Sequence, residues 1–254
     1  MDSAVAASYK SPSQVARVVT EAWCAASLYC ARCPADRLLR TPPNTPATDL
    51  KCSDCGSGYE VKSMRRLAKD RVPDAGYDAM LRAIRANAAP NLFVLHYDHD
   101  WRVQNLLLVP SFFFSEGAIE PRKPLQGAAR RAGWVGCNIR LTAIAPEGRL
   151  KIVENGKVVD PALVRAEYAR VQPLSDVRPY SRGWTLEVLR AIHDLGKIEF
   201  TLSDAYKAER RLTKLFPNNR HIRPKIRQQL QVLRDLKLLE FINRGQYRLS
   251  ARKA

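Results

Sequence analysis

Asp49, Glu60 and Lys62 form an acidic and basic group whose residue types and spacing could do chemistry. Ten residues separate Asp49 from Glu60, and one residue separates Glu60 from Lys62. Two carboxylates at the end of a hairpin suit Mg²⁺, a hard ion that prefers oxygen ligands and keeps several waters. A lysine beside them can polarise an attacking water and stabilise charge on a phosphate. This group predicts metal-assisted chemistry on a phosphate, although the pattern alone also fits an exposed hairpin with alternating charges.

Four cysteines form a second group, in two pairs with two residues inside each pair and eighteen residues between the pairs. They are Cys30, Cys33, Cys52 and Cys55. Two such turns aim four thiolates at one ion and leave no open position for chemistry, so we predict a structural zinc site. The alternative is a pair of disulfides, which the expected intracellular location disfavours. Cys24 and Cys137 have no partner at suitable spacing, and we expect buried thiols at both positions.

The hydrophobic pattern predicts the elements that must position these groups. Alternation over 59–63 places Glu60 and Lys62 on one face of a strand. A second strand that carries Asp49 can pair with it through the turn at 56–58. The other predicted elements are a helix over 13–26, a helix over 77–87, and strands over 92–95 and 103–109.

The acidic group and this order of elements resemble the PD-(D/E)xK nucleases, with Thr48 where the family name has proline. The resemblance implies an α+β/α/β nuclease core in which Asp49, Glu60 and the Val61 carbonyl hold Mg²⁺. Lys62 would then orient the water that attacks the phosphodiester.

Two further acidic features need an interpretation. Glu21 on the first helix is a candidate auxiliary metal ligand, although a solvated or salt-bridged glutamate fits its position as well. The run from His96 to Asp100 could suggest another metal site. It lies between two apolar strands, where polar residues make a turn, so we interpret it as a turn.

Charge divides the chain into two parts. The sequence holds 42 Lys and Arg against 25 Asp and Glu, a net charge of +17 that points to a polyanionic partner. Residues 178–254 contain 18 basic and 7 acidic residues, and the segment 173–182 looks like a linker. We therefore predict domains over 1–177 and 178–254. No apolar run long enough to span a membrane and no secretory signal are present, so a cytoplasmic protein is expected.

The second domain is predicted to be a winged helix. Its pattern gives a helix from Gly183 to about Gly196, a second from Thr201 or Ser203 to about Phe216, a third over 222–236, and a hairpin over 238–249. The polar face of the third helix can read or hold DNA, because Arg and Gln suit base edges in a major groove and Lys suits phosphate. Its candidate DNA-binding residues are Arg223, Lys225, Arg227 and Gln228. The alternative is a merely solubilising charged face.

With both halves in place, the whole chain resembles the methyl-directed restriction endonucleases of the DpnI type. The shared runs include VVTE at 18–21, RKPL at 122–125, ARRAGWVGCNI at 129–139, SRGWT at 181–185 and IRQQL at 226–230. The resemblance implies a monomeric type II enzyme that cuts double-stranded DNA at GATC when the adenine carries an N6-methyl group. It implies that both domains read the methylated site, with catalytic Mg²⁺ and structural zinc.

Trp134 is the candidate contact for the methyl group, because a tryptophan face offers flat apolar surface. Arg130 and Arg131 beside it would hold phosphate. A core tryptophan is the alternative interpretation.

Two other classes of protein fit part of the pattern. A non-catalytic, zinc-stabilised regulator or methyl-DNA reader explains the charge, the zinc and the winged helix. It does not explain the nuclease spacing of Asp49, Glu60 and Lys62. An RNA-binding zinc protein is less well supported, since the third helix suits a DNA major groove better than the deep, narrow groove of RNA.

Overall fold

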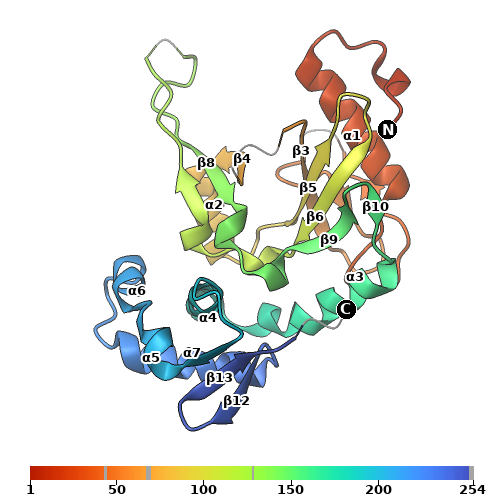
Figure 1. Ribbon diagram of the computed structural model, residues 1–254. Coiled ribbons are helices and arrows are strands. Elements are labelled where there is room, and N and C mark those ends of the chain that lie inside the picture. Colours follow the sequence, from red (N-terminus) through yellow and green to blue (C-terminus); the bar gives the residue numbers. More distant parts are fainter. Residues whose placement is uncertain (43–44, 67–69, 128, 252–254) are drawn as a thin grey trace.

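A seven-stranded sheet forms the centre of the first domain in the computed structural model, which describes residues 1–42, 45–66, 70–127 and 129–251 (Figure 1). Its strand order is β1-β2-β3-β5-β6-β9-β10. The strands are β1 (Leu39–Arg40), β2 (Leu50–Lys51), β3 (Gly58–Met64), β5 (Asn91–Tyr97), β6 (Val103–Val109), β9 (Leu150–Glu154) and β10 (Lys157–Val158). β3 and β5 run parallel, and the other neighbours pair antiparallel. Helix α1 (Pro12–Ser27) contacts β1 and β3, and α3 (Pro161–Val171) contacts β9.

A second, antiparallel sheet stands beside the first and has the order β4-β8-β7. It consists of β4 (Arg71–Gly76), β8 (Gly136–Arg140) and β7 (Ile119–Pro121), and it packs against helix α2 (Tyr77–Arg85). Residues 122–127 and 129–135, between β7 and β8, leave this sheet as a long projection (Figure 1).

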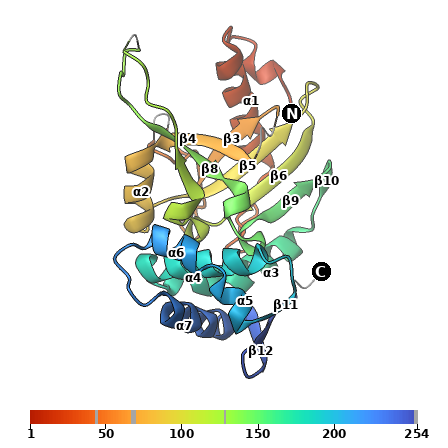
Figure 2. The same ribbon diagram turned by 60° about the vertical axis from the view of Figure 1, so that its left-hand side comes forward.

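The second domain contains four helices and a three-stranded sheet of order β11-β13-β12. The helices are α4 (Pro179–His193), α5 (Leu202–Tyr206), α6 (Glu209–Leu215) and α7 (Ile222–Asp235); the strands are β11 (Glu199–Thr201), β12 (Leu239–Asn243) and β13 (Gln246–Leu249). Helix α4 contacts both α2 of the first domain and α7, which lies on the far side of α4 from the central sheet (Figure 2). The predicted mixed α/β core followed by a winged-helix unit is confirmed.

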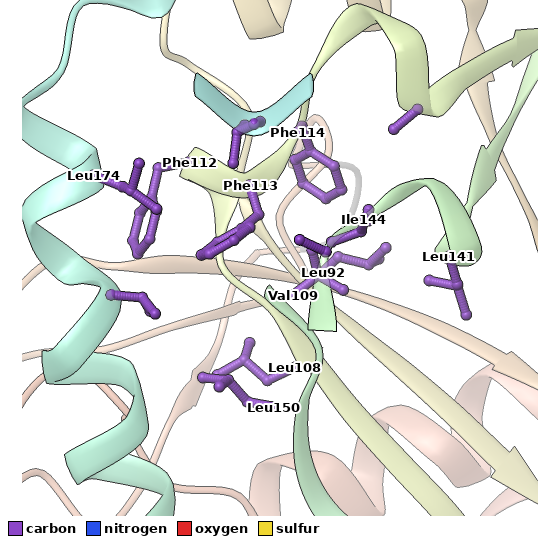
Figure 3. Packing of buried hydrophobic residues seen from close by; sticks show 14 of the residues in the cluster. Leu92, Leu108, Val109, Phe112, Phe113, Phe114, Leu141, Ile144, Leu150 and Leu174 are labelled. Atoms are coloured by element: carbon purple, nitrogen blue, oxygen red, sulfur yellow. The ribbon is translucent and has the colours of Figure 1, made fainter. Parts of the chain in front are cut away.

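The hydrophobic core is continuous across both domains. Figure 3 shows its middle, where strands β5, β6 and β9 meet a run of three aromatic residues, Phe112, Phe113 and Phe114. Leu174, from the 3₁₀ helix at Gln172–Asp176, packs at the same place and is fully buried.

Buried polar contacts also join the domains. Glu187 on α4 accepts a hydrogen bond of 2.7 Å from the Ser115 hydroxyl of the first domain. His193 Nε2 lies 3.0 Å from the Glu147 carboxylate, and Arg182 donates to Asn87 at 2.7 Å. The side chains of Glu187 and Arg182 are nearly inaccessible to solvent, so these polar groups are buried where the domains meet.

Two predicted segments differ from the structure. The presumed linker 173–182 is helical over most of its length, because Pro173 and Pro179 each occupy the first turn of a helix, where a missing amide hydrogen costs nothing. The single helix predicted to reach Phe216 is divided into α5 and α6. At the break, Lys207 and Ala208 donate to carbonyls three residues back instead of four, as in a 3₁₀ turn.

Within the described ranges, none of the helices is both long and apolar enough to cross a bilayer. The buried, unpartnered thiols expected at Cys24 and Cys137 are confirmed.

Candidate active site and metal centre

Strands β2 and β3 bring the acidic group together. Residue Asp49 precedes β2, and its backbone N–H donates to the Tyr59 carbonyl at 2.9 Å. Its side chain turns toward β3, where Oδ2 accepts a hydrogen bond of 2.7 Å from the Val61 backbone N–H. This bond fixes the Asp49 carboxylate beside the backbone segment that carries Glu60 and Lys62.

Lys62 lies on the same face of β3 as Glu60, as the alternation predicts. The ammonium Nζ of Lys62 is 2.5 Å from Glu60 Oε1 and 2.9 Å from Asp74 Oδ1. Burial alone would lower the pKa of Lys62, but the carboxylates of Asp74 and Glu60 raise it above its ordinary value. Lys62 is therefore a fixed cation at neutral pH, suited to electrostatic work rather than to removing a proton.

Glu60 occupies an environment that disfavours its charge. Burial and then the Asp74 carboxylate raise the pKa of Glu60 to about 7, although Lys62 opposes this shift. Asp49 contributes in the same direction. Crowded carboxylates of this kind form an anionic site that a divalent cation would relieve, and the donors are the hard oxygens that Mg²⁺ prefers.

Asp74 is the site residue that the sequence pattern did not reveal. It comes from β4, whose register pairs Asp74 with Cys137 of β8. The packing of two separate sheets brings Asp74 to Lys62, and the sequence RVPDAG has no alternation typical of a strand.

The cysteines converge as predicted. The Sγ atoms of Cys30, Cys33, Cys52 and Cys55 all lie within 4.8 Å of one another. Two of the separations, Cys30–Cys55 and Cys33–Cys52, are 3.5 Å, too long for disulfides and close to the sulfur–sulfur spacing of about 3.8 Å in a tetrahedral zinc site. Among the described residues, this is the one group of three or more potential ligands that is so compact. The cluster could hold zinc, whereas the Mg²⁺ ligands stay a prediction.

The cysteine cluster is attached directly to β3, the strand that carries Glu60 and Lys62. Tyr59 on β3 is fully buried, and its hydroxyl lies 3.2 Å from Cys30 Sγ. The next residue is Glu60. From the other side, Arg165 on α3 donates to the carbonyls of Cys30 and Ala35 at 3.1 Å. The cysteine cluster, the hairpin and α3 therefore hold one another in place.

Trp134 is half-buried at the base of the projection between β7 and β8. It is therefore neither a core tryptophan nor a fully exposed one. A Cβ added to Gly76 would lie 3.3 Å from its indole nitrogen, and one added to Gly136 would lie 2.8 Å from its ring. Arg131 covers the ring at 5.1 Å, and Arg130 is exposed. A groove lined by Tyr77, Arg82 and Trp134 opens at this place.

The other candidate residues have mixed surroundings. Glu21 forms a salt bridge of 2.9 Å with Arg40. Of the two interpretations of Glu21, the structure therefore shows the salt-bridged glutamate. In the predicted turn at 96–100, Asp98 Oδ1 accepts from the backbone N–H groups of Asp100 and Arg102, both at 2.9 Å. Asp98 therefore stabilises the turn.

The candidate DNA-binding residues lie on α7, with Arg227 and Gln228 exposed and Lys225 half-buried. Lys225 donates to Gln228 at 2.8 Å. Arg223 is exposed too, but it bonds Glu209 at 2.8 Å and covers the Tyr206 ring at 5.2 Å. Arg227 and Gln228 are therefore better placed than Arg223 to meet a ligand.

Comparison with known families gives two matches that together span nearly the whole chain. Residues 1–177 match the DpnI model, described as the Dam-replacing family. Residues 180–249 match the DpnI_C model, described as the Dam-replacing HTH domain.

Proposed function

Because this chain belongs to the DpnI, or Dam-replacing, family of restriction-type DNA-binding nucleases, we propose that it is a methyl-directed type II restriction endonuclease. The proposed substrate is double-stranded DNA at GATC with N6-methyladenine. The convergence of Asp49, Glu60 and Lys62 on one strand end is the observation that carries the proposal. A methyl-DNA reader without activity does not require a half-buried lysine between two carboxylates beside Asp49.

The proposed reaction is hydrolysis of the phosphodiester. The oxygen of a water molecule attacks phosphorus, and the bond to the 3′-oxygen breaks, which leaves a 5′-phosphate and a 3′-hydroxyl. Asp49 and Glu60, with the Val61 carbonyl, would hold Mg²⁺, which when bound neutralises phosphate charge and lowers the pKa of water. Asp49 is oriented for this task by the Val61 N–H. Lys62, protonated at neutral pH, orients the water and stabilises charge developing on the phosphate.

Recognition is assigned to two places. Trp134, backed by Gly76 and Gly136, offers a flat apolar face for the methyl group, and Arg130 and Arg131 hold phosphate next to it. The exposed face of α7, with Lys225, Arg227 and Gln228, holds a duplex in its major groove. Since α7 lies beyond α4 from the central sheet, the winged helix and the nuclease site contact different stretches of DNA.

The decisive experiment incubates the protein and Mg²⁺ with one plasmid in adenine-methylated and unmethylated forms. Digestion of the methylated form alone is expected. Lys62→Ala should slow cleavage by about 10²–10³-fold, because it removes a preorganised cation from the transition state. The matched control is Lys157→Ala on the exposed edge strand β10, which should cut at the wild-type rate. Intact plasmid that is nevertheless retained selectively would support the non-catalytic reader instead.

A further inference from the structure

Asp74 is a buried carboxylate that the nuclease motif does not contain. Its side chain is 2% exposed, and its Oδ1 lies 2.9 Å from Lys62 Nζ. The Lys62 side chain is 26% exposed, so the pair is partly withdrawn from water. A carboxylate so placed is costly unless it is paired, and Lys62 is the cation within ion-pair distance.

During the reaction, Glu60 and Asp74 cannot both remain ion-pair partners of Lys62. Glu60 contacts Lys62 at 2.5 Å, but under the proposed function its oxygens turn to Mg²⁺. An ammonium on a flexible four-carbon stem then has Asp74 as its remaining fixed anion. Asp74 is well suited to this task because it belongs to another sheet and does not move with β3.

The backbone around Asp74 is fixed by strand pairing. β4 pairs with β8 on either side of the residue, through Pro73 with Asn138 and Gly76 with Gly136. A register shift between Asp74 and Gly76 re-aims the strand at this point, as bulges near active sites do. The Asp74 side chain is therefore presented by a rigid element and not by a loop.

On the basis of the proposed function, we infer that Asp74 is a positioning residue that holds the Lys62 ammonium beside the attacking water. It acts through Lys62 and does not bind Mg²⁺. Its removal leaves DNA binding unchanged and lowers the rate of the chemical step even when Mg²⁺ is saturating.

The test is Asp74→Asn, which keeps the shape of the side chain and removes its charge. Single-turnover cleavage of methylated DNA should slow by about 10–100-fold, since a displacement of about 1 Å can cost that much. The dissociation constant for methylated DNA should stay within twofold of wild type, and the slower rate should persist at saturating Mg²⁺. Asp176→Asn, which removes an exposed carboxylate with the same charge change, should cut at the wild-type rate.

A double-mutant cycle separates the two ways in which Asp74 could act. In a Lys62→Ala background, Asp74→Asn should cause no further loss. A further tenfold loss there, or recovery of the wild-type rate by the single variant at saturating Mg²⁺, would make Asp74 a metal ligand and overturn the inference. Wild-type cleavage by Asp74→Asn would overturn it too.

Two further results keep the outcomes distinct. Cleavage at the wild-type rate by Lys62→Ala would show that the proposed catalytic site is wrong. If Lys62→Ala is inactive but Asp74→Asn cuts at the wild-type rate, only the positioning role of Asp74 is wrong. If Asp74→Asn does not fold, a structure of the wild-type protein with Mg²⁺ and a non-cleavable methylated duplex decides. In that structure the Lys62 ammonium should remain in contact with Asp74 while Glu60 faces Mg²⁺. A Lys62 ammonium that no longer contacts Asp74 would contradict the inference.

Discussion

At the scale of single residues, the environment of Trp134 is unusual because two glycines form its support. The indole lies against the backbone of β4 and β8, where a Cβ on Gly76 or Gly136 would crowd it. A large flat side chain held in this way is preorganised, so little conformational entropy is lost when a base contacts it.

Trp134→Ala should therefore weaken the preference for methylated over unmethylated duplex by about tenfold, since such a contact contributes roughly 1–1.5 kcal/mol. The measurement is equilibrium binding to the two duplexes in Ca²⁺, without cleavage. Trp101→Ala is the matched control, because Trp101 stacks on Tyr97 at the turn between β5 and β6. An unchanged ratio of affinities in Trp134→Ala would remove this residue from methyl recognition.

At the scale of elements, the β2–β3 hairpin carries both the proposed catalytic residues and two of the four clustered cysteines. Cys52 and Cys55 lie between Asp49 and Glu60, and Tyr59 links the cysteine cluster to β3. The proposed zinc site and the proposed active site therefore depend on the same backbone segment.

Zinc removal should unfold this hairpin and with it the first domain, because binding free energy at a structural site is folding free energy. Cys52→Ser should reduce bound zinc from one ion per chain to nearly none, with lower thermal stability and no cleavage. The control is Cys24→Ala, a buried thiol outside the cluster, which should keep one zinc. Omission of Mg²⁺ should stop cleavage and leave the unfolding transition in place. Full zinc content in Cys52→Ser would disprove the assigned ligands.

The capping box of α5 makes a prediction about pH. Thr201 accepts from the Asp204 backbone N–H, and Asp204 accepts from that of Thr201. Hydrogen bonds from Lys207, then those from Thr201, hold the pKa of Asp204 well below its ordinary value of 3.8. A depressed carboxyl pKa means stability that is present above pH 3.8 and is lost as the pH falls below it.

Asp204→Asn should therefore lower the free energy of unfolding at pH 7 by more than it does near pH 3. The measurement is urea denaturation at both values. Asp235→Asn, at the C-terminal end of α7, removes a carboxylate with no capping role and should have little effect at either pH. Equal losses at the two pH values in Asp204→Asn would contradict the linkage.

At the scale of the whole molecule, the domain interface resembles a core more than a hinge. Trp184 and Phe216 stack at 3.8 Å beneath it, and Arg211 reaches the Glu187 carbonyl at 2.7 Å. Gly117 of the first domain lies so close that an added Cβ would be 2.3 Å from Glu187 Oε1. A movement of Glu187 away from this Cβ would break its hydrogen bond with Ser115, in a place where the Glu187 side chain is 2% exposed.

Gly117→Ala should therefore destabilise the protein by about 1–3 kcal/mol, the usual range for overpacking. Chemical denaturation measures the loss, and limited proteolysis near residue 178 should become faster as the domains separate. Gly127→Ala is the control, since an added Cβ there meets nothing within 4 Å. Equal stability of Gly117→Ala and wild type would show that the interface is looser than its packing indicates.

Prediction from sequence is strongest where the signal is local. The four cysteines, which converge as predicted, fall within 26 residues, and the helix pattern of α7 repeats clearly over its 14 residues. Asp49, Glu60 and Lys62 are also close in sequence, and their catalytic roles stay a prediction. It missed Asp74, because β4 contains Pro73, lacks alternation and meets Lys62 through the packing of two sheets. It also missed the interface, where Glu187 and Arg182 are polar residues that become buried only when the domains meet. No local pattern distinguishes such residues from solvated ones.

The register between β2 and β3 sets a limit on how sequences of this kind can vary. Leu50 pairs with Tyr59, and side chains alternate between the faces of β3, so one inserted residue in the hairpin would turn Glu60 and Lys62 into the core. The turn between the strands cannot absorb that residue, because Cys52 and Cys55 are tied to the first cysteine pair. Insertions and deletions should therefore be purged between Asp49 and Glu60 as long as the four cysteines persist. In related sequences without the four cysteines, the number of residues between the two acidic positions should vary.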